Sequence, residues 1–429
     1  MAVTFLDIPP EVFWQITLEL DPLDVARLSQ TNTVIASYIY DPANQLLWRN
    51  LYLAQLLDDP RECIGPLGEP PKQEVDWKSE LKKVIRAKVI VNNPGVCREH
   101  EGEETVRNLL HLATHVLPNR SVSDSGDDGE VSGNLAWLAS LLRGGKFFDH
   151  PQWSVSPKER ALRAQLHTLF GLTADDFRPP RRVESRGFVY AMRNYKEVND
   201  YGPFLMDGSG RVNWEHILYI QHCISMHLIP PGAVDTENAF SISPLSLPFC
   251  QSVIPRELNL DTVQDWAGVE GGWHCSFAFC DHRELLVYNN FNESDELQLQ
   301  TEIFTDPSFM EAFRTLHITV KVTATVPDPE HPTRPKIMWE GRIGGTHMMS
   351  GWVKVTPDGH IRWHFVSGEP GLPMWSSEGI QVGGVRSPFG VLGVWTTVSH
   401  DLHDPVGPFW MRKVRHEVFD FHEDDEDGF

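Results

Sequence analysis

Long apolar runs are missing from this sequence of 429 residues. No window approaches the roughly 18 consecutive apolar residues that a membrane-spanning helix requires. The first residues also lack the basic start and unbroken apolar stretch of a signal peptide, because Asp7, Pro9, Pro10 and Glu11 interrupt them. We therefore expect a soluble protein that has no membrane partner and is not exported through a signal peptide.

Cysteine is sparse, and its spacing is irregular. The six Cys residues do not form the short, regular framework of a disulfide-stabilised domain, and a chain of this length does not need one. We expect reduced thiols, as in a protein of the cytoplasm, the nucleus or both.

Positive charge is in deficit. The sequence has 37 Lys and Arg against 59 Asp and Glu, a formal net charge of −22, and such a field repels polyphosphates. The most basic local stretch, Lys82, Lys83, Arg86 and Lys88, is short and fits a solvent-exposed helix face. We therefore expect no nucleic-acid partner.

Tryptophan, in contrast, is abundant. The chain has 14 Trp residues, and hydrophobic residues make up 41% of it. This composition is typical of folded proteins, and the length predicts two or three hydrophobic cores. So many indoles have to be buried in cores or displayed at binding surfaces.

Residues 1–57 are predicted to form a compact helical unit. Val12, Ile16 and Leu20 recur on one helical face, and Asp21-Pro22 ends that first helix. About fifty residues cannot bury much apolar surface by themselves. We expect a partner or a neighbouring domain to cover the rest.

A helical middle region is predicted over residues 72–230, after a linker rich in proline and glycine. Within it, the small and acidic residues 121–133 predict a flexible loop. Besides the helix that begins near residue 76, helical patterns cover residues 104–117, 134–143, 157–171 and 214–228. Asn213 is the expected N-cap of the last of these.

The period changes in the C-terminal part of the chain. Short runs rich in β-branched and aromatic residues predict an antiparallel β-barrel or sandwich over residues 260–415. Its clearest hairpin is residues 351–366, with the turn at Pro357-Asp358-Gly359. The runs lie at residues 273–290, 316–326, 337–343, 351–366, 378–384 and 390–398. The fold class is therefore α+β, and residues 416–429 are expected to be a solvated acidic tail.

The N-terminal residues follow a family pattern in order and spacing. These are Leu6, Ile8-Pro9, Glu11, Val12, Ile16, Leu20, Asp21-Pro22-Leu23, Asp24-Val25, Arg27-Leu28 and Leu47-Trp48-Arg49. The segment resembles an F-box, a module of three helices, although the usual Leu-Pro is Ile-Pro here. The resemblance implies docking to the adaptor of an SCF-type ubiquitin ligase and, through it, to a cullin. The implied adaptor-binding residues are Leu6, Ile8, Pro9, Val12, Ile16, Leu20, Leu23, Val25, Leu28 and Trp48.

The remainder of the chain also resembles known proteins. Residues 180–413 are similar to the C-terminal region of fungal F-box proteins of the basidiomycete type, for example in GWVKVTPDGHIRWHFVSG and DPVGPFW. The closing strands resemble the lipocalin-like barrel of some animal F-box proteins. These resemblances imply a domain that recruits a protein substrate, without naming the substrate.

Three constellations of reactive residues have simpler structural explanations. The cluster His274-Cys275 and Cys280-x-His282 has zinc-like ligands, but on a strand its two Cys side chains point to opposite faces. His400 and His403 fit a solvated loop, and the glycines at 383–393 fit a tight barrel corner because no Gly-Lys-Ser/Thr follows. We therefore expect no catalytic residue, no metal and no cofactor.

The β region is the expected place for substrate recognition. Five Trp residues alternate there with polar and basic residues, so a small barrel would enclose an aromatic pocket with polar groups at its mouth. Such a pocket suits an acidic or C-terminal peptide. The candidate substrate-binding residues are Arg342, Trp352, Arg362, Trp363, Trp375 and Arg386.

Two hypotheses from different classes follow. In the first, the chain is a non-catalytic substrate receptor of an SCF-type ubiquitin ligase, with the F-box docking the adaptor and the β domain holding a protein substrate. In the second, it is a β-barrel that binds a small molecule or lipid, and the N-terminal helices serve only packing. An independent enzyme ranks third because no nucleophile and base are paired by spacing.

Overall fold

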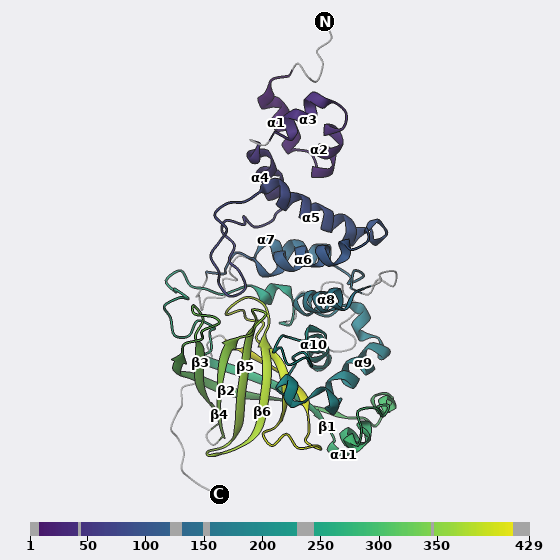
Figure 1. The fold of residues 1–429 in the computed structure, drawn as a ribbon, viewed down its shortest axis with the longest axis vertical. Coiled ribbons are helices and arrows are strands. Elements are labelled where there is room, and N and C mark those ends of the chain that lie inside the picture. The colour runs from purple at the N-terminus through teal and green to yellow at the C-terminus, as the bar shows by residue number, and fades with distance from the viewer. Residues whose placement is uncertain are drawn as a thin grey trace.

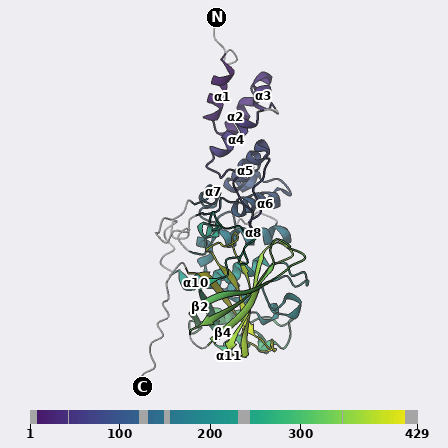
Figure 2. The ribbon, with the colours of Figure 1, turned by 90° about the vertical axis from the view of Figure 1, so that its left-hand side faces the viewer.

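The computed structural model describes residues 8–41, 44–120, 131–148, 155–229, 244–344 and 347–414. Leu6, most of the predicted acidic loop and the predicted tail at 416–429 lie outside the described residues. Helices form one end of an elongated molecule and a β-barrel forms the other (Figure 1, Figure 2). The α+β class is confirmed, and the barrel is closed.

Four short helices form the N-terminal unit. Asp21 and Asn32 begin two of them, each accepting a hydrogen bond from the backbone two residues on. The fourth helix covers a segment for which the sequence predicted no helix, and the first ends at Leu18, before Leu20. The elements are α1 (Pro10–Leu18), α2 (Pro22–Ser29), α3 (Thr33–Ile39) and α4 (Gln45–Leu53).

Six further helices follow, of which α5–α8 form a stack next to this unit and α9 and α10 lie beside the barrel (Figure 1). They are α5 (Trp77–Asn92), α6 (Glu101–Thr114), α7 (Gly133–Leu141), α8 (Pro157–Phe170), α9 (Pro179–Val189) and α10 (Trp214–Leu228). All except α9 were predicted, and Asn213 caps α10 as expected. Helix α9 was not predicted because its sequence is polar. It begins with the pair Pro179-Pro180 in its first turn.

Eight antiparallel strands close into a barrel in which each strand pairs with the next and β1 pairs with β8. The strands are β1 (Gly271–Cys280), β2 (Glu311–Val326), β3 (Lys336–Ile343), β4 (His347–Val355), β5 (Ile361–Glu369), β6 (Leu372–Gln381), β7 (Val391–Thr397) and β8 (Gly407–Lys413). Closure decides between the predicted barrel and sandwich, because a sandwich keeps open sheet edges.

The predicted hairpin is confirmed as β4 and β5. Gly359 adopts a φ of +80°, which favours glycine, and the N–H of Thr356 donates to the carbonyl of His360 at 2.7 Å. Asp358 at the tip accepts a hydrogen bond from the N–H of Val212 at 3.1 Å. The turn therefore also fastens the barrel to the segment that precedes α10.

Two parts of the strand prediction are wrong. The predicted run at 273–290 contains β1 only up to Cys280, and the rest forms α11 (His282–Tyr288). Asp281 between them accepts hydrogen bonds from two helical N–H groups, so it ends the strand by beginning a helix. The sequence runs also omitted β8, whose short Gly407–Lys413 segment contains a proline.

The hydrophobic core of the helices continues onto the outside of the barrel. Helix α10 packs on β1, β7 and β8, and Leu392 and Trp410 on the barrel wall belong to the same buried cluster as the helices. The barrel interior forms a second cluster. The predicted boundary between middle region and β domain therefore runs through a shared core.

Candidate functional site

One end of the barrel is filled by indole rings. Trp363 contacts Trp273 at a centroid distance of 5.1 Å and Trp339 at 5.9 Å. Trp266, which precedes β1 and is fully buried, donates a hydrogen bond from its ring to the carbonyl of Pro335 at 2.8 Å. This half of the interior is a packed core.

The other half of the interior encloses a cavity of about 610 Å³. Its walls are mainly aromatic and aliphatic, and it reaches the surface beside the exposed side chains of Arg314 and Met374. The lining residues are Cys275, Phe277, Phe279, Arg314, Leu316, Ile318, Ile343, His347, Met349, Phe365, Ser367, Gly368, Met374, Trp375, Ser377, Trp395 and Phe409. The volume lies within the range of about 300–1,000 Å³ that is usual for ligand pockets.

Few polar side chains line this cavity. They are Arg314, His347, Ser367 and Ser377, and no Asp or Glu is among the lining residues. The side chain of Arg314 has no hydrogen-bond or ion-pair partner within the described part of the chain. The cavity thus combines an apolar interior with an unneutralised cation at its mouth.

The rim of the mouth carries exposed apolar side chains. Leu372, the first residue of β6, is 61% exposed, and Met374 two residues further on is also exposed. Met310, which directly precedes β2, is exposed at the same end. Exposed apolar groups that surround a pocket are typical of binding sites.

The structure does not bring the six predicted substrate-binding residues together. Trp375 lines the cavity, whereas Trp363 is buried in the filled half. Arg342 and Trp352 are on the outer face of β3 and β4, outside the cavity. The expectation of one basic pocket that they share is therefore wrong.

The other two predicted arginines hold the fold together. Arg362 on the outer wall donates to Glu378 and to Asp200, each at 2.8 Å, and so ties the barrel to the segment before α10. Arg386 lies beside the filled end, where it donates to the carbonyl of Asp265 at 2.6 Å.

Arg314 was not among the predicted binding residues, which were tryptophans of the β region and arginines near them in the sequence. The signal was the alternation of β2. Arg314 shares its strand face with Leu316, Ile318 and Val320, so a basic residue precedes the inward-facing apolar positions of one strand.

The N-terminal unit presents a second candidate surface. Helix α1 buries Phe13 and Thr17, while Val12 and Ile16 on its other side are 42% and 38% exposed. Leu23 at the start of α2 is 40% exposed. We call Val12, Ile16 and Leu23 the exposed apolar face.

The other predicted adaptor-binding residues have mixed positions. Pro9 is exposed, and Ile8, Leu20 and Leu28 are half-buried. Val25 and Trp48 were also predicted to bind the adaptor, but both are buried within the unit and do not form part of its surface. The Trp48 ring stacks on Tyr40 at 5.7 Å, so it supports the unit from inside. Val34, Tyr38 and Leu46 are exposed apolar residues that were not among the predicted adaptor-binding residues.

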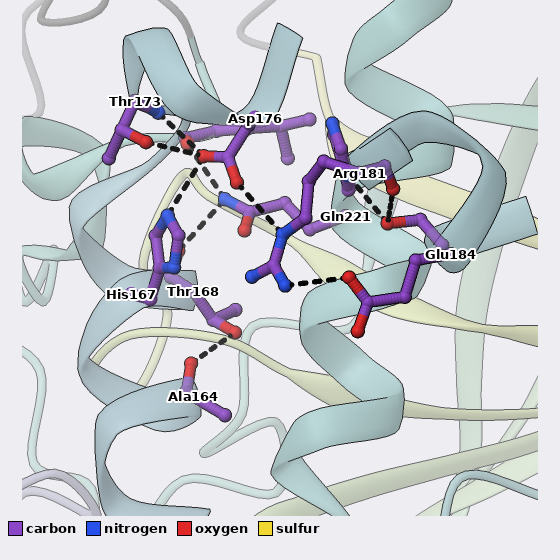
Figure 3. Close-up of polar contacts among 11 residues, drawn as sticks. Ala164, His167, Thr168, Thr173, Asp176, Arg181, Glu184 and Gln221 are labelled. Carbon is purple, nitrogen blue, oxygen red and sulfur yellow. Dashed lines mark hydrogen bonds and ion pairs between the residues drawn. The ribbon is translucent and has the colours of Figure 1, made fainter. Parts of the chain in front are cut away.

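A buried polar network in the helical region needs separate consideration, because it contains His167 and Asp176 (Figure 3) and lies beside a pair of serine and histidine. Asp176 accepts hydrogen bonds from Thr173 and lies 2.9 Å from Nε2 of His167. Burial acts to raise the pKa of Asp176, but the neighbouring His167 holds it well below its usual range.

Ser185 and His222 lie beside this network. The Oγ of Ser185 is 2.6 Å from Nδ1 of His222, and burial lowers the pKa of His222 to about 4. Ser185 has no exposed surface, so no substrate reaches its hydroxyl. These hydrogen bonds link α8, α9 and α10, and the buried Ser185 is not accessible to a substrate.

The two Cys residues of the zinc-like cluster lie on different sides of the barrel wall. Cys275 belongs to the interior cluster of the barrel and Cys280 to the helical cluster outside it. Within the described ranges, no group of three or more His, Cys, Asp or Glu residues is arranged to hold a metal ion. Among these same residues, no helix has the length and apolar character needed to cross a membrane.

Three comparisons with known proteins found no match. No protein-family model matches the chain, and no curated protein or solved structure is significantly similar to it. Function is therefore inferred from the chemistry of the cavity and of the exposed apolar face.

Proposed function

We propose that this chain is a non-catalytic substrate receptor of an SCF-type cullin ubiquitin ligase, acting in the cytoplasm, the nucleus or both. The N-terminal unit docks the adaptor, and the barrel recruits a protein substrate. The observation that carries the proposal is the exposed apolar face of Val12, Ile16 and Leu23. It occupies positions at which the sequence resembles an F-box.

The position of the two regions supports this division of work. The filled end of the barrel packs against the linker after α4, where the N–H of Val385 donates to the carbonyl of Pro66 at 2.8 Å. Helix α11, which follows the open end of β1, lies at the opposite end of the molecule from α1–α3 (Figure 1). A substrate at the open end leaves the exposed apolar face free for the adaptor.

Such a receptor needs no catalytic group. It acts by proximity, because holding a substrate raises the effective concentration of its lysines near the conjugating enzyme that other subunits bring. The partners are therefore the adaptor, a cullin bound through it, and a protein substrate.

Co-purification with the adaptor tests the proposal. Wild-type chain, Ile16→Asp and the control Lys82→Asp, an exposed site on α5, are compared by pull-down and by calorimetry. We expect wild type and the control to bind, and Ile16→Asp to lose binding because a charge enters an apolar interface. If folded wild-type chain does not bind the adaptor at micromolar concentration, the proposal is wrong.

The cavity supports a second candidate function, a barrel that binds a small molecule or lipid. Closed barrels of eight strands have room for one small ligand if side chains leave part of the interior open. Here the indoles fill one half and leave about 610 Å³ in the other. Native mass spectrometry of purified chain tests this candidate, and a barrel that neither carries nor takes up any small apolar compound contradicts it.

A further inference from the structure

The walls of the cavity restrict the kind of group that can enter it. The deep positions are apolar, such as Ile318, Met349 and Phe409. A buried amide that finds no hydrogen-bond partner is costly, and among the described residues only two hydroxyls, those of Ser367 and Ser377, line the cavity. A hydrocarbon tail fits these walls better than a peptide backbone, which would bring an N–H and a carbonyl with every residue.

Arg314 restricts the charge of the polar group that a ligand can place at the mouth of the cavity. Two arginines elsewhere around the barrel are paired with carboxylates, Arg334 with Asp261 at 2.7 Å and Arg362 with Glu378 at 2.8 Å. Arg342 and Arg412 have no carboxylate partner among the described residues, but they are on the outer face and do not line the cavity. Arg314 has no such partner among the described residues, and no acidic residue lines the cavity. Glu311, three positions earlier, is engaged by Arg186 at 2.9 Å on the outside of the barrel.

We propose that the cavity binds a small amphiphile with one carboxylate and an aliphatic tail, and that Arg314 binds the carboxylate. The tail fills the apolar interior between Trp375, Trp395 and Phe365. The planar guanidinium of arginine matches a carboxylate through two parallel hydrogen bonds. This inference rests on the second candidate function, ligand binding by the barrel.

The two parts of the ligand contribute in separable ways. Each methylene that moves from water into the apolar cavity strengthens binding about fourfold. The charge-assisted hydrogen bonds to Arg314 add about tenfold, a modest factor because this side chain is exposed to solvent. A neutral head on the same tail therefore binds more weakly, and a cationic head binds weakest of all.

Isothermal titration calorimetry with the full chain tests the inference at neutral pH. The probes are decanoate, decan-1-ol and decyltrimethylammonium, each below its micellar concentration. We expect decanoate to bind about tenfold more tightly than decan-1-ol. Arg314→Gln should remove this preference and leave the binding of decan-1-ol unchanged.

Two further variants serve as controls. Lys321→Gln removes a cation from the outer face of the same strand, outside the cavity, and should bind decanoate like wild type. Leu316→Trp, which fills part of the cavity from its wall, should weaken decanoate and decan-1-ol equally. Thermal unfolding of every variant confirms that it is folded.

The outcomes separate this inference from the function on which it rests. If decanoate and decan-1-ol bind equally and Arg314→Gln changes neither, the barrel binds ligands but the carboxylate inference is overturned. If neither probe binds folded wild type, ligand binding by the barrel fails together with the inference. Tight binding of a peptide C-terminus, combined with no binding of decanoate, also overturns it.

Discussion

Helices α1–α4 leave apolar side chains exposed on their outer surface, whereas the barrel lines an enclosed cavity with its apolar side chains. The helices have only seven to nine residues each, and they enclose a small core around Phe13, Val25 and Ile39. The closed sheet turns one face of every strand inward and encloses both its indoles and its cavity. The helices therefore offer a surface to a macromolecule, and the barrel offers a compartment to a small one.

The largest expected effect concerns the two halves of the barrel. Trp363→Ala removes a fully buried ring from the filled half and should lower the free energy of unfolding by about 3–5 kcal/mol. Leu316→Ala, at the wall of the existing cavity, should cost less than about 1 kcal/mol. Urea unfolding measures both, and equal losses would show that the cavity half is as tightly packed as the indole half.

A smaller effect separates binding from stability in the N-terminal unit. Ile16→Ala should change the free energy of unfolding by less than about 0.5 kcal/mol, because the side chain is 38% exposed. It should nevertheless weaken adaptor binding by about 2 kcal/mol, more than tenfold. Phe13→Ala on the buried side of α1 is the matched variant, and it should mainly lower stability. Loss of stability without loss of adaptor affinity in Ile16→Ala would contradict the exposed apolar face as a docking surface.

Helix α10, which packs between α8, α9 and the barrel wall, contains a buried histidine that should make stability depend on pH. Burial lowers the pKa of His216 on α10 from 6.5 to about 3. Between these values the unfolded chain binds a proton that the folded protein does not, so the free energy of unfolding falls as the pH falls below 6.5. The slope from this group is about 1.4 kcal/mol per pH unit.

Unfolding curves from pH 6 to pH 4 measure this contribution. His216→Gln should have a shallower pH dependence than wild type by about that slope, whatever its stability at pH 7. An unchanged slope would mean that His216 is accessible to protons in the folded state.

The smallest expected effect lies in the barrel wall. Gly359→Ala should cost about 1 kcal/mol, because nothing surrounds the new methyl group and only the φ of +80° is unfavourable. Gly272→Ala on β1 also meets no neighbour and has no positive φ, so it should be close to neutral. Thermal unfolding compares the two, and equal effects would show that the turn tolerates a side chain at Gly359.

Features that depend on neighbours in sequence were predicted well. Asn213 precedes a helical pattern and caps α10, and Pro357-Asp358-Gly359 lies between alternating runs and forms the β4–β5 turn. The opposite orientation of Cys275 and Cys280 followed from strand geometry alone. Helix α11 was missed because its apolar residues also suit a strand, and the capping role of Asp281 was not weighed against them.

The candidate sites were predicted less completely. Val12, Ile16 and Leu23 are exposed on the predicted unit, but Val25 and Trp48 from the same pattern are buried. In the barrel, Trp375 lines the cavity, whereas the predicted arginines face outward or fasten loops. A sequence pattern identifies which residues share a strand face, but it does not identify which residues of different strands surround the same part of the barrel interior.

The sequence by itself determined the α+β class, most helices of the middle region, the main turn and the excess of indoles, because these follow from spacing, side-chain chemistry and local backbone preference. Only the tertiary structure decided that β1 pairs with β8, that Trp273, Trp339 and Trp363 fill one half of the interior, and that Arg314 lines the cavity in the other half. Closure joins residues more than a hundred positions apart, and only closure determines which side chains share the enclosed space.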